Sequence, residues 1–303
     1  MSLLYSPRLH HPNILANCPL FRSLLPRQSK SNRPTHLHFY IKMTDEWSPL
    51  ISGKERGASD NKFNRFLDRA CIVSGYLNDA LLFGGMLIGG YIPILPPTTS
   101  VEDVHEHYVK WDRGLRICAT FWILTGITYP FFTSGVSKQL RRTPGISPVL
   151  VNAWNMSSVV VNMIILATGL WMCQAGYRLD RSPEVISALH DIIIIYIVIP
   201  FTPLAVQAWV VALAVYQDYA GDKDPSPSRH LYPKWVGWFN FVAPIIQAPA
   251  IATHFVYHGP LAWNGILAFW IPAIAFGIQV NVMSYASLNA IDKVLDHEKE
   301  IFD

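Results

Sequence analysis

The sequence predicts an all-α fold, in which about six to seven transmembrane helices form a polytopic bundle. Two features of the composition predict it: 51% of the 303 residues are hydrophobic and only 15% are charged, compared with about 25% in a typical soluble domain. The uncharged residues also gather in runs of about 20, the helix length that crosses about 30 Å of hydrocarbon. We therefore expect a multi-pass integral membrane protein that lies in a lipid bilayer.

Residues 1–70 form a basic amino-terminal region, which we expect to be disordered. The first 44 residues carry six lysines and arginines and no acid. An acid-free leader of this kind is typical of a transit peptide, but five prolines oppose an amphipathic helix. Met43 opens a second possible start of translation. A disordered tail or a misplaced start codon is therefore preferred, and whether residues 1–42 belong to the mature protein stays open.

The transmembrane bundle is expected over residues 71–292. Its first span ends at Pro96-Pro97, and its fourth begins at Ser182-Pro183, with serine at the N-cap and proline at the first helical position. Residues 293–303 form a polar tail, the end of a short exposed helix. The six expected spans cover residues 75–95, 115–136, 149–174, 183–217, 235–257 and 264–286.

The fourth span is too long for one straight helix, which would measure about 54 Å at 1.5 Å per residue. Pro200 and Pro203 predict a kink, because a proline inside a helix removes a hydrogen bond. Neighbouring helices must then satisfy the freed carbonyl groups, so we expect this span at the centre of the bundle. We expect the last two spans to be broken in the same way by Pro244, Pro249 and Pro272. Bent helices leave a cavity more readily than straight ones.

An interfacial amphipathic helix is expected after the first span, in the segment "SVEDVHEHYVKWDRG". Ser100 and Asp103 resemble a capping box, and Val101, Val104 and Tyr108 line one face. Lysine and arginine are concentrated in the loops 137–148 and 219–234, which places those loops in the cytoplasm. The interfacial helix then lies on the opposite side of the membrane.

Asp191 is the first candidate catalytic residue, because an ionisable group inside a span is a functional hypothesis by default. It follows Glu184 by two helical turns, so both acids share a face, and it lies about 12 Å inside the helix start. A carboxyl group that apolar surroundings keep un-ionised can act as a general acid. His190 or Glu184 would then set its ionisation. The alternative is a solvated Asp191 at the headgroup level, paired with Arg178 or Arg181.

Other ionisable residues are weaker catalytic candidates. Asp218 ends its helix and is expected to meet water, and Glu102 is expected on the wet face of the interfacial helix. Asp79 follows Asn78 near the start of the first span. Aromatic and polar residues at the non-cytoplasmic end are the candidates for substrate binding: Trp171, Trp263, Asn264, Tyr108 and His254.

The sequence predicts no metal, no cofactor and no nucleic acid partner. His254 and His258 are spaced to share a helix face, but no further ligands with matching spacing accompany them. The four cysteines lack a CxxC spacing, and no glycine-rich phosphate loop is present. A net charge of +3 is too small to indicate nucleic acid binding.

With Asp191, the segments "GYIPILPP", "YPKWVGW" and "GPLAWNGILAFW" give the chain a resemblance to fungal integral-membrane terpene cyclases of meroterpenoid biosynthesis, over roughly residues 70–292. The resemblance implies a small hydrophobic prenylated substrate. An epoxide or alkene is protonated, a ring closes through a carbocation, and a proton is lost. It also implies that Asp191 and Asp218 are the first acids to test as proton donors. Other enzymes of the pathway would be partners of the protein, and the endoplasmic reticulum would be its membrane. The better-known cyclases have about seven spans, and the six counted here depart from that pattern.

Two alternatives stay open. A sterol-isomerase-like enzyme would protonate an alkene and remove a different proton without closing a ring. A non-catalytic transporter or scaffold would instead use polar groups such as Asn162 and Gln207, near mid-span, as a water-accessible path. Aromatic residues that suit a carbocation are common in all helical membrane proteins.

Overall fold

The structure is a computed structural model that describes residues 58–302, except residue 144 and residues 221–229. The chain divides after Gly57, so most of the basic amino-terminal region lies outside the described residues. The described residues form helices and contain no strand. The all-α prediction is therefore confirmed, and the part of residues 1–70 that is described belongs to a helix.

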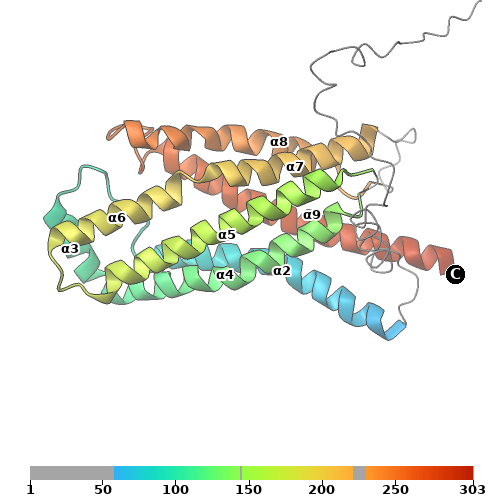
Figure 1. The fold of residues 1–303 in the computed structure, drawn as a ribbon, viewed down its shortest axis with the longest axis horizontal. Helices are drawn as coiled ribbons and strands as arrows, with labels where there is room; N and C mark the ends of the chain where they lie inside the picture. The colour runs from blue at the N-terminus through green and yellow to red at the C-terminus, as the bar shows by residue number, and fades with distance from the viewer. Residues whose placement is uncertain (1–57, 144, 221–229, 303) are drawn as a thin grey trace, which may run out of the picture. The chain divides into compact units, whose positions relative to one another are not determined.

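The helices run along one another as a bundle (Figure 1). The bundle has two ends, which we name the α3 end and the C-terminal end after the elements that lie there. In chain order the elements are α2 (Ala58–Ile88), α3 (Val101–Lys110), α4 (Asp112–Leu140), α5 (Pro148–Tyr177), α6 (Pro183–Val198), α7 (Phe201–Ala220), α8 (Lys234–Gln247), the 3-10 helix η3 (Ala248–Phe255), the π-helix η4 (Ile266–Trp270) and α9 (Ile271–Phe302).

Six helical segments among the described residues are long and apolar enough to cross a membrane, which fits a multi-pass integral membrane protein. Each expected span has one counterpart, and the differences lie at the ends. The segments are Phe63–Ile88, Asp112–Leu140, Pro148–Tyr177, Pro183–Ala220, Lys234–Phe255 and Ile266–Lys293.

The first span lies earlier in the chain than we expected, because glycines rather than prolines end its helix. Gly90 has a φ of +69°, in the left-handed region that favours glycine. A Cβ atom at Gly90 would clash with the indole ring of Trp111. The Tyr91 N–H then donates to the carbonyl of Met86, at 2.9 Å, and closes the helix end. Pro96 and Pro97 lie in the connection that follows.

The fourth span is broken where Pro200 and Pro203 predicted it. α6 ends at Val198 and α7 begins at Phe201, and the Phe201 N–H donates to the Ile199 carbonyl at 2.7 Å.

The last two spans change helix type beside Pro249 and Pro272, where α8 is followed by the 3-10 helix η3 and the π-helix η4 by α9. Pro244 lies inside α8, and the bend expected there stays a prediction.

The interfacial helix α3 is confirmed as a separate short helix. The Ser100 hydroxyl accepts a hydrogen bond from the backbone N–H of Asp103, at 3.1 Å, which satisfies one free donor at the helix start. Val104 and Tyr108 are buried, whereas Val101 is only half-buried. The face packs against α6, so α3 belongs to the bundle rather than lying on it loosely.

The polar carboxyl end of the chain continues α9 without a break to Phe302. It is not a separate short helix.

At several glycines, the helix backbone packs closely against a neighbouring helix. A Cβ atom at Gly89 would lie 2.7 Å from Cβ of Cys118, and one at Gly169 would lie 3.1 Å from the Ile123 backbone nitrogen. Small residues allow helices to pack this closely in membranes.

Gly114→Ala is expected to destabilise the protein by about 1–3 kcal/mol, the usual cost of overpacking. The new Cβ atom would overlap the backbone carbonyl oxygen of Ile88, which cannot move without shifting the end of α2. Thermal unfolding of the purified protein in detergent measures the effect. Gly84→Ala is the matched control, because nothing lies within 4 Å of a Cβ atom there. Equal melting temperatures for the two variants would contradict the packing argument.

Candidate functional site

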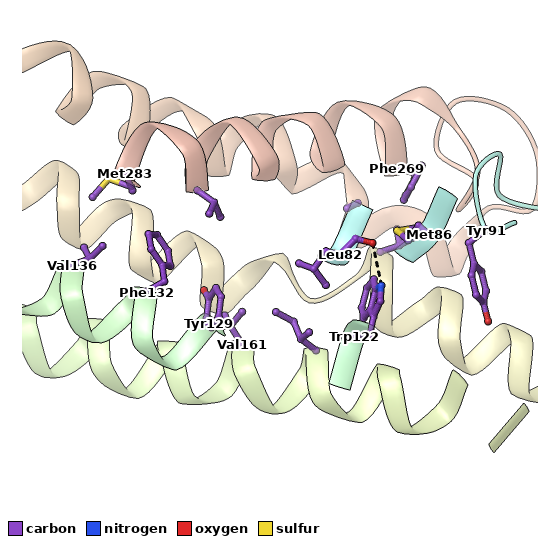
Figure 2. Packing of buried hydrophobic residues seen from close by; sticks show 14 of the residues in the cluster. Leu82, Met86, Tyr91, Trp122, Tyr129, Phe132, Val136, Val161, Phe269 and Met283 are labelled. Carbon is purple, nitrogen blue, oxygen red and sulfur yellow. Dashed lines mark hydrogen bonds between the residues drawn. The ribbon is translucent and has the colours of Figure 1, made fainter. Parts of the chain in front are cut away.

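A cavity of about 120 Å³ lies where the broken helices meet. The α6–α7 junction, the π-helix η4 and the start of α9 supply one side, and α2, α4 and α5 supply the other. Figure 2 shows four of the lining residues close together: Leu82, Met86, Trp122 and Phe269. The lining residues are Leu82, Phe83, Met86, Trp122, Val161, Ile164, Ile165, Thr168, Tyr196, Ile197, Val198, Pro200, Phe201, Leu204, Gln247, Ala268, Phe269, Pro272, Ala273 and Phe276.

The walls of this cavity are almost entirely apolar, and two of the few polar side chains on them bond to backbone carbonyls. The indole N–H of Trp122 donates to the Leu82 carbonyl at 3.3 Å (Figure 2). The Thr168 hydroxyl donates to the Ile164 carbonyl at 2.8 Å. An apolar cavity of about 150 Å³ binds benzene, so this one fits a group of about the size of one isoprene unit.

Side-chain amides lie toward the C-terminal end of the cavity. The Gln247 amide donates to the Gln279 carbonyl oxygen at 3.2 Å and joins α8 to α9. The Tyr129 hydroxyl donates to Gln207 at 2.7 Å, and the Gln207 amide donates to Ser158, also at 2.7 Å. This chain joins α4, α7 and α5, so neutral hydrogen bonds connect most of the bundle on this side.

Asp79 lies one helical turn before the first cavity-lining residue of α2, Leu82. It precedes Leu82, Phe83 and Met86 on α2 by three, four and seven residues, so all four lie on one helix face. Its side chain is 7% exposed, and the Asn281 amide donates to its Oδ2 at 2.8 Å. Its Oδ1 has no hydrogen-bond partner among the described residues. An unpaired carboxyl oxygen inside a span is a candidate proton donor or acceptor.

Asp79 was only a weak candidate in the sequence analysis because the first span was expected too far along the chain. In a span over residues 75–95, Asp79 stands near the entrance, where acids meet water. In the observed span Phe63–Ile88 it lies in the interior. The glycine pair Gly89-Gly90 favours a helix end, and it could have been used to end the first span before residue 90.

A hydrogen-bonded group of rings lies at the α3 end of the bundle. The hydroxyl groups of Tyr91 and Tyr108 are 3.0 Å apart, and the Tyr108 hydroxyl is 3.2 Å from Nδ1 of His190. Trp263 contacts the His190 ring edge to face, at 6.3 Å between centroids, and its indole N–H donates to the Leu95 carbonyl at 2.8 Å. The structure thus brings together three residues that the sequence had placed at this end: Tyr108, His190 and Trp263.

This ring cluster is buried and its phenols are neutral. His190 is 2% exposed, and its Nε2 has no hydrogen-bond partner among the described residues. Burial raises the pKa of Tyr91 and of Tyr108 well above the usual phenol value, and the charge of Asp191 is a minor addition at Tyr108. The two phenols and the His190 ring are therefore linked in series by hydrogen bonds.

Two chain segments connect the ring cluster to the cavity. The Tyr91 N–H bonds to the carbonyl of Met86, which lines the cavity. Ile197, also in the cavity wall, follows His190 by seven residues on the same face of α6. Along the bundle in Figure 2, Tyr129 lies on one side of Leu82 and Trp122, and Tyr91 lies on the other. The cavity therefore lies between Asp79 and the ring cluster.

Asp191, Glu184 and Glu102 have exposed side chains and do not line the cavity. Successive residues of a helix point about 100° apart, so Asp191 faces outward while its neighbour His190 faces the bundle. The catalytic roles suggested for the three acids stay predictions, and their positions do not support a shared chamber.

The remaining binding candidates also lie away from the cavity wall. Trp171 and Asn264 are half-buried, and His254 is exposed. The 3-10 helix η3 ends at Phe255, so His254 and His258 do not share a helix face, and that expectation is wrong. Among the described residues, no three His, Cys, Asp or Glu side chains come together as a possible metal site.

Asp218 is buried at the C-terminal end of the bundle, not solvated as we expected. Its Oδ2 lies 3.4 Å from Nδ1 of His230, whose ring stacks on Tyr219 at 3.5 Å between centroids. Asp191 and Asp218 are about 40 Å apart along the fourth span at 1.5 Å per residue. They therefore cannot act on the same reacting group.

No family model, no curated protein and no solved structure matches this chain.

Proposed function

We propose that the protein is a membrane-embedded terpene cyclase that protonates an alkene or epoxide of a prenylated substrate and closes a ring through a carbocation. One observation carries the proposal. An apolar cavity with aromatic residues in its wall lies, in register along the bundle, between a buried carboxyl group and a hydrogen-bonded Tyr–His chain, both just beyond the residues that line it. The endoplasmic reticulum, with its prenylated intermediates, is the membrane we propose for it.

The cavity wall favours an apolar molecule over an ion or a polar solute. An ion path needs oxygen ligands or water. Besides Trp122, the wall has three polar side chains, those of Thr168, Tyr196 and Gln247. The side chains of Thr168 and Gln247 bond to neighbours. A transport function would require polar groups along the whole bundle. The apolar section between Asp79 and His190 interrupts any such path.

In the proposed reaction, Asp79 gives its proton to the terminal alkene carbon or the epoxide oxygen. A carbon–carbon double bond of the next isoprene unit then attacks the cationic carbon, and the new bond closes the ring; this step requires the cavity to widen beyond the one unit that it fits. The faces of Trp122, Phe83 and Phe269 stabilise the cation, as aromatic rings do for other cations. His190 accepts the proton lost from a neighbouring carbon. One proton enters and one leaves, so substrate and product are isomers. Asp79 is left ionised and His190 protonated, and each exchanges one proton with water before the next turnover.

The positions of Asp79 and His190 also suit the sterol-isomerase-like alternative. Donor and acceptor on opposite sides of one cavity allow a proton to be added at one carbon and removed at another, with no ring closure. The two reactions share the acid and the base and differ only in whether a second double bond is within reach of the cation. Product structure separates them.

The proposal is tested by incubating the purified protein with an epoxidised farnesyl-phenol and analysing the products by mass spectrometry and NMR. We expect a cyclic isomer of the substrate. Ala273→Phe, which fills the cavity, should abolish it, while Ile274→Phe on the exposed side of α9 should leave it unchanged. A wild-type protein that yields neither a cyclised nor an isomerised product would contradict the proposal.

A further inference from the structure

A groove of about 720 Å³ lies between α7 and α8 at the C-terminal end of the bundle. The two helices lie side by side in Figure 1. They touch at the floor of the groove, where a Cβ atom at Gly237 would lie 2.9 Å from Val215. The groove is lined by Trp209, Ala212, Leu213, Val215, Tyr216, Tyr219, Lys234, Gly237, Trp238 and Phe241.

Aromatic side chains form both walls of this groove and face away from the bundle. Tyr216 on α7 is 71% exposed and Trp238 on α8 is 70% exposed. The Trp209 indole N–H donates to the Phe241 carbonyl at 3.3 Å, which bridges the helices at the deep end. Both helices belong to candidate membrane spans, so the groove opens toward lipid acyl chains.

Lys234 places a positive charge at the shallow end of the groove. It is the first residue of α8 and of its span, so it stands at headgroup level. Its Nζ lies 4.8 Å from the centroid of the Tyr219 ring, and no ion pair with an acid is seen for it among the described residues. A lysine at this level attracts a phosphate group, and aromatic rings are favoured at the same depth.

The depth of the groove matches one leaflet. From Lys234 to Phe241 the helix rises about 10 Å, and from Tyr219 to Trp209 about 15 Å. Half of the hydrocarbon thickness is about 15 Å. One acyl chain of a lipid in the nearer leaflet therefore fits between the aromatic walls while its phosphate reaches Lys234.

We propose that this groove is a specific binding site for an anionic glycerophospholipid. One acyl chain lies along Val215 and Gly237, and the phosphate and anionic headgroup contact Lys234. The lysine- and arginine-rich loops predict that this end faces the cytoplasm, where anionic lipids are concentrated in the membrane leaflet. The proposal is independent of the catalytic function.

The test is native mass spectrometry of the purified full chain, titrated with phosphatidylserine or with phosphatidylcholine of the same acyl chains. We expect the wild type to bind phosphatidylserine about fivefold more tightly, the effect of about one lysine near an anionic headgroup. Lys234→Ala should remove this preference and Lys234→Arg should keep it. Inorganic phosphate should not compete, because it lacks the acyl chain.

Trp238→Ala should weaken the binding of both lipids, because it opens one wall. Trp235→Ala is its matched control, since Trp235 is 49% exposed on the same helix and does not line the groove. Melting temperatures confirm that the variants are folded. Equal affinity of the wild type for the two lipids, an unchanged preference in Lys234→Ala, or equal effects of the two tryptophan variants would overturn the proposal.

Discussion

Asp79→Asn is expected to lower the turnover of a prenylated substrate by about 10²–10⁴-fold, the usual contribution of a positioned general acid. Asparagine has nearly the same shape and still pairs with Asn281, so the fold should be retained. It cannot donate a proton to an alkene. Single-turnover product formation, measured with saturating substrate, isolates this step from substrate entry.

Asp191→Asn and Asp218→Asn are the matched controls for this experiment. Each removes one carboxyl group that the sequence also nominated. Asp191 is exposed, and Asp218 lies beside His230 at the C-terminal end of the bundle, so neither shares a helix face with the cavity residues of α2 as Asp79 does. We expect both variants to keep turnover within about twofold of the wild type. Substitutions at an exposed position such as Asp191 have small effects, and asparagine keeps the size of the buried Asp218 side chain. If Asp191→Asn alone abolished product, the acid would be Asp191, and the assignment to Asp79 would be wrong.

His190→Phe is expected to lower turnover by about 10²-fold or more, because it removes the group that accepts the final proton. Phenylalanine keeps a ring between Tyr91 and Trp263, so the packing at the α3 end should survive. We also expect a different product mixture, since a cation without its base loses a proton elsewhere or captures water. Gas chromatography with mass spectrometry separates these products.

Tyr108→Phe distinguishes proton transfer from packing at the same position. It removes only the hydroxyl group that links Tyr91 to His190. A smaller loss of turnover, with the wild-type product mixture, is expected if His190 is the immediate acceptor and Tyr108 relays the proton onward. Wild-type turnover and products in His190→Phe would exclude His190 from the reaction.

The sequence predicted the span count and the broken fourth span well, because length, hydropathy and proline act locally. The end of α2 was misjudged, since it depends on the contact of Gly90 with Trp111, a residue 21 positions later. That contact is set by how α3 and α4 fold back. The misplaced end then hid the interior position of Asp79.

The candidate site was predicted in part. Tyr108, His190 and Trp263 were assigned to one end of the bundle because they lie at matching ends of different helices. The neighbouring sequence could not predict whether the Asp191 side chain faces the bundle interior or the lipid. In the run of isoleucines that follows it, every face is apolar, and in a membrane the lipid side and the interior side look alike. Only tertiary packing decides which residue points inward.

The joint between α6 and α7 has a mechanical consequence. α6 carries His190 and α7 carries Gln207, and the two half-helices meet at mid-depth without a continuous hydrogen-bond ladder. Because Pro200 has no N–H, the Tyr196 carbonyl beside the cavity loses its helical donor. Swinging α6 about this hinge would widen the cavity beyond one isoprene unit. We therefore expect bilayer thickness, which sets helix tilt, to influence how long a prenyl chain the protein accepts.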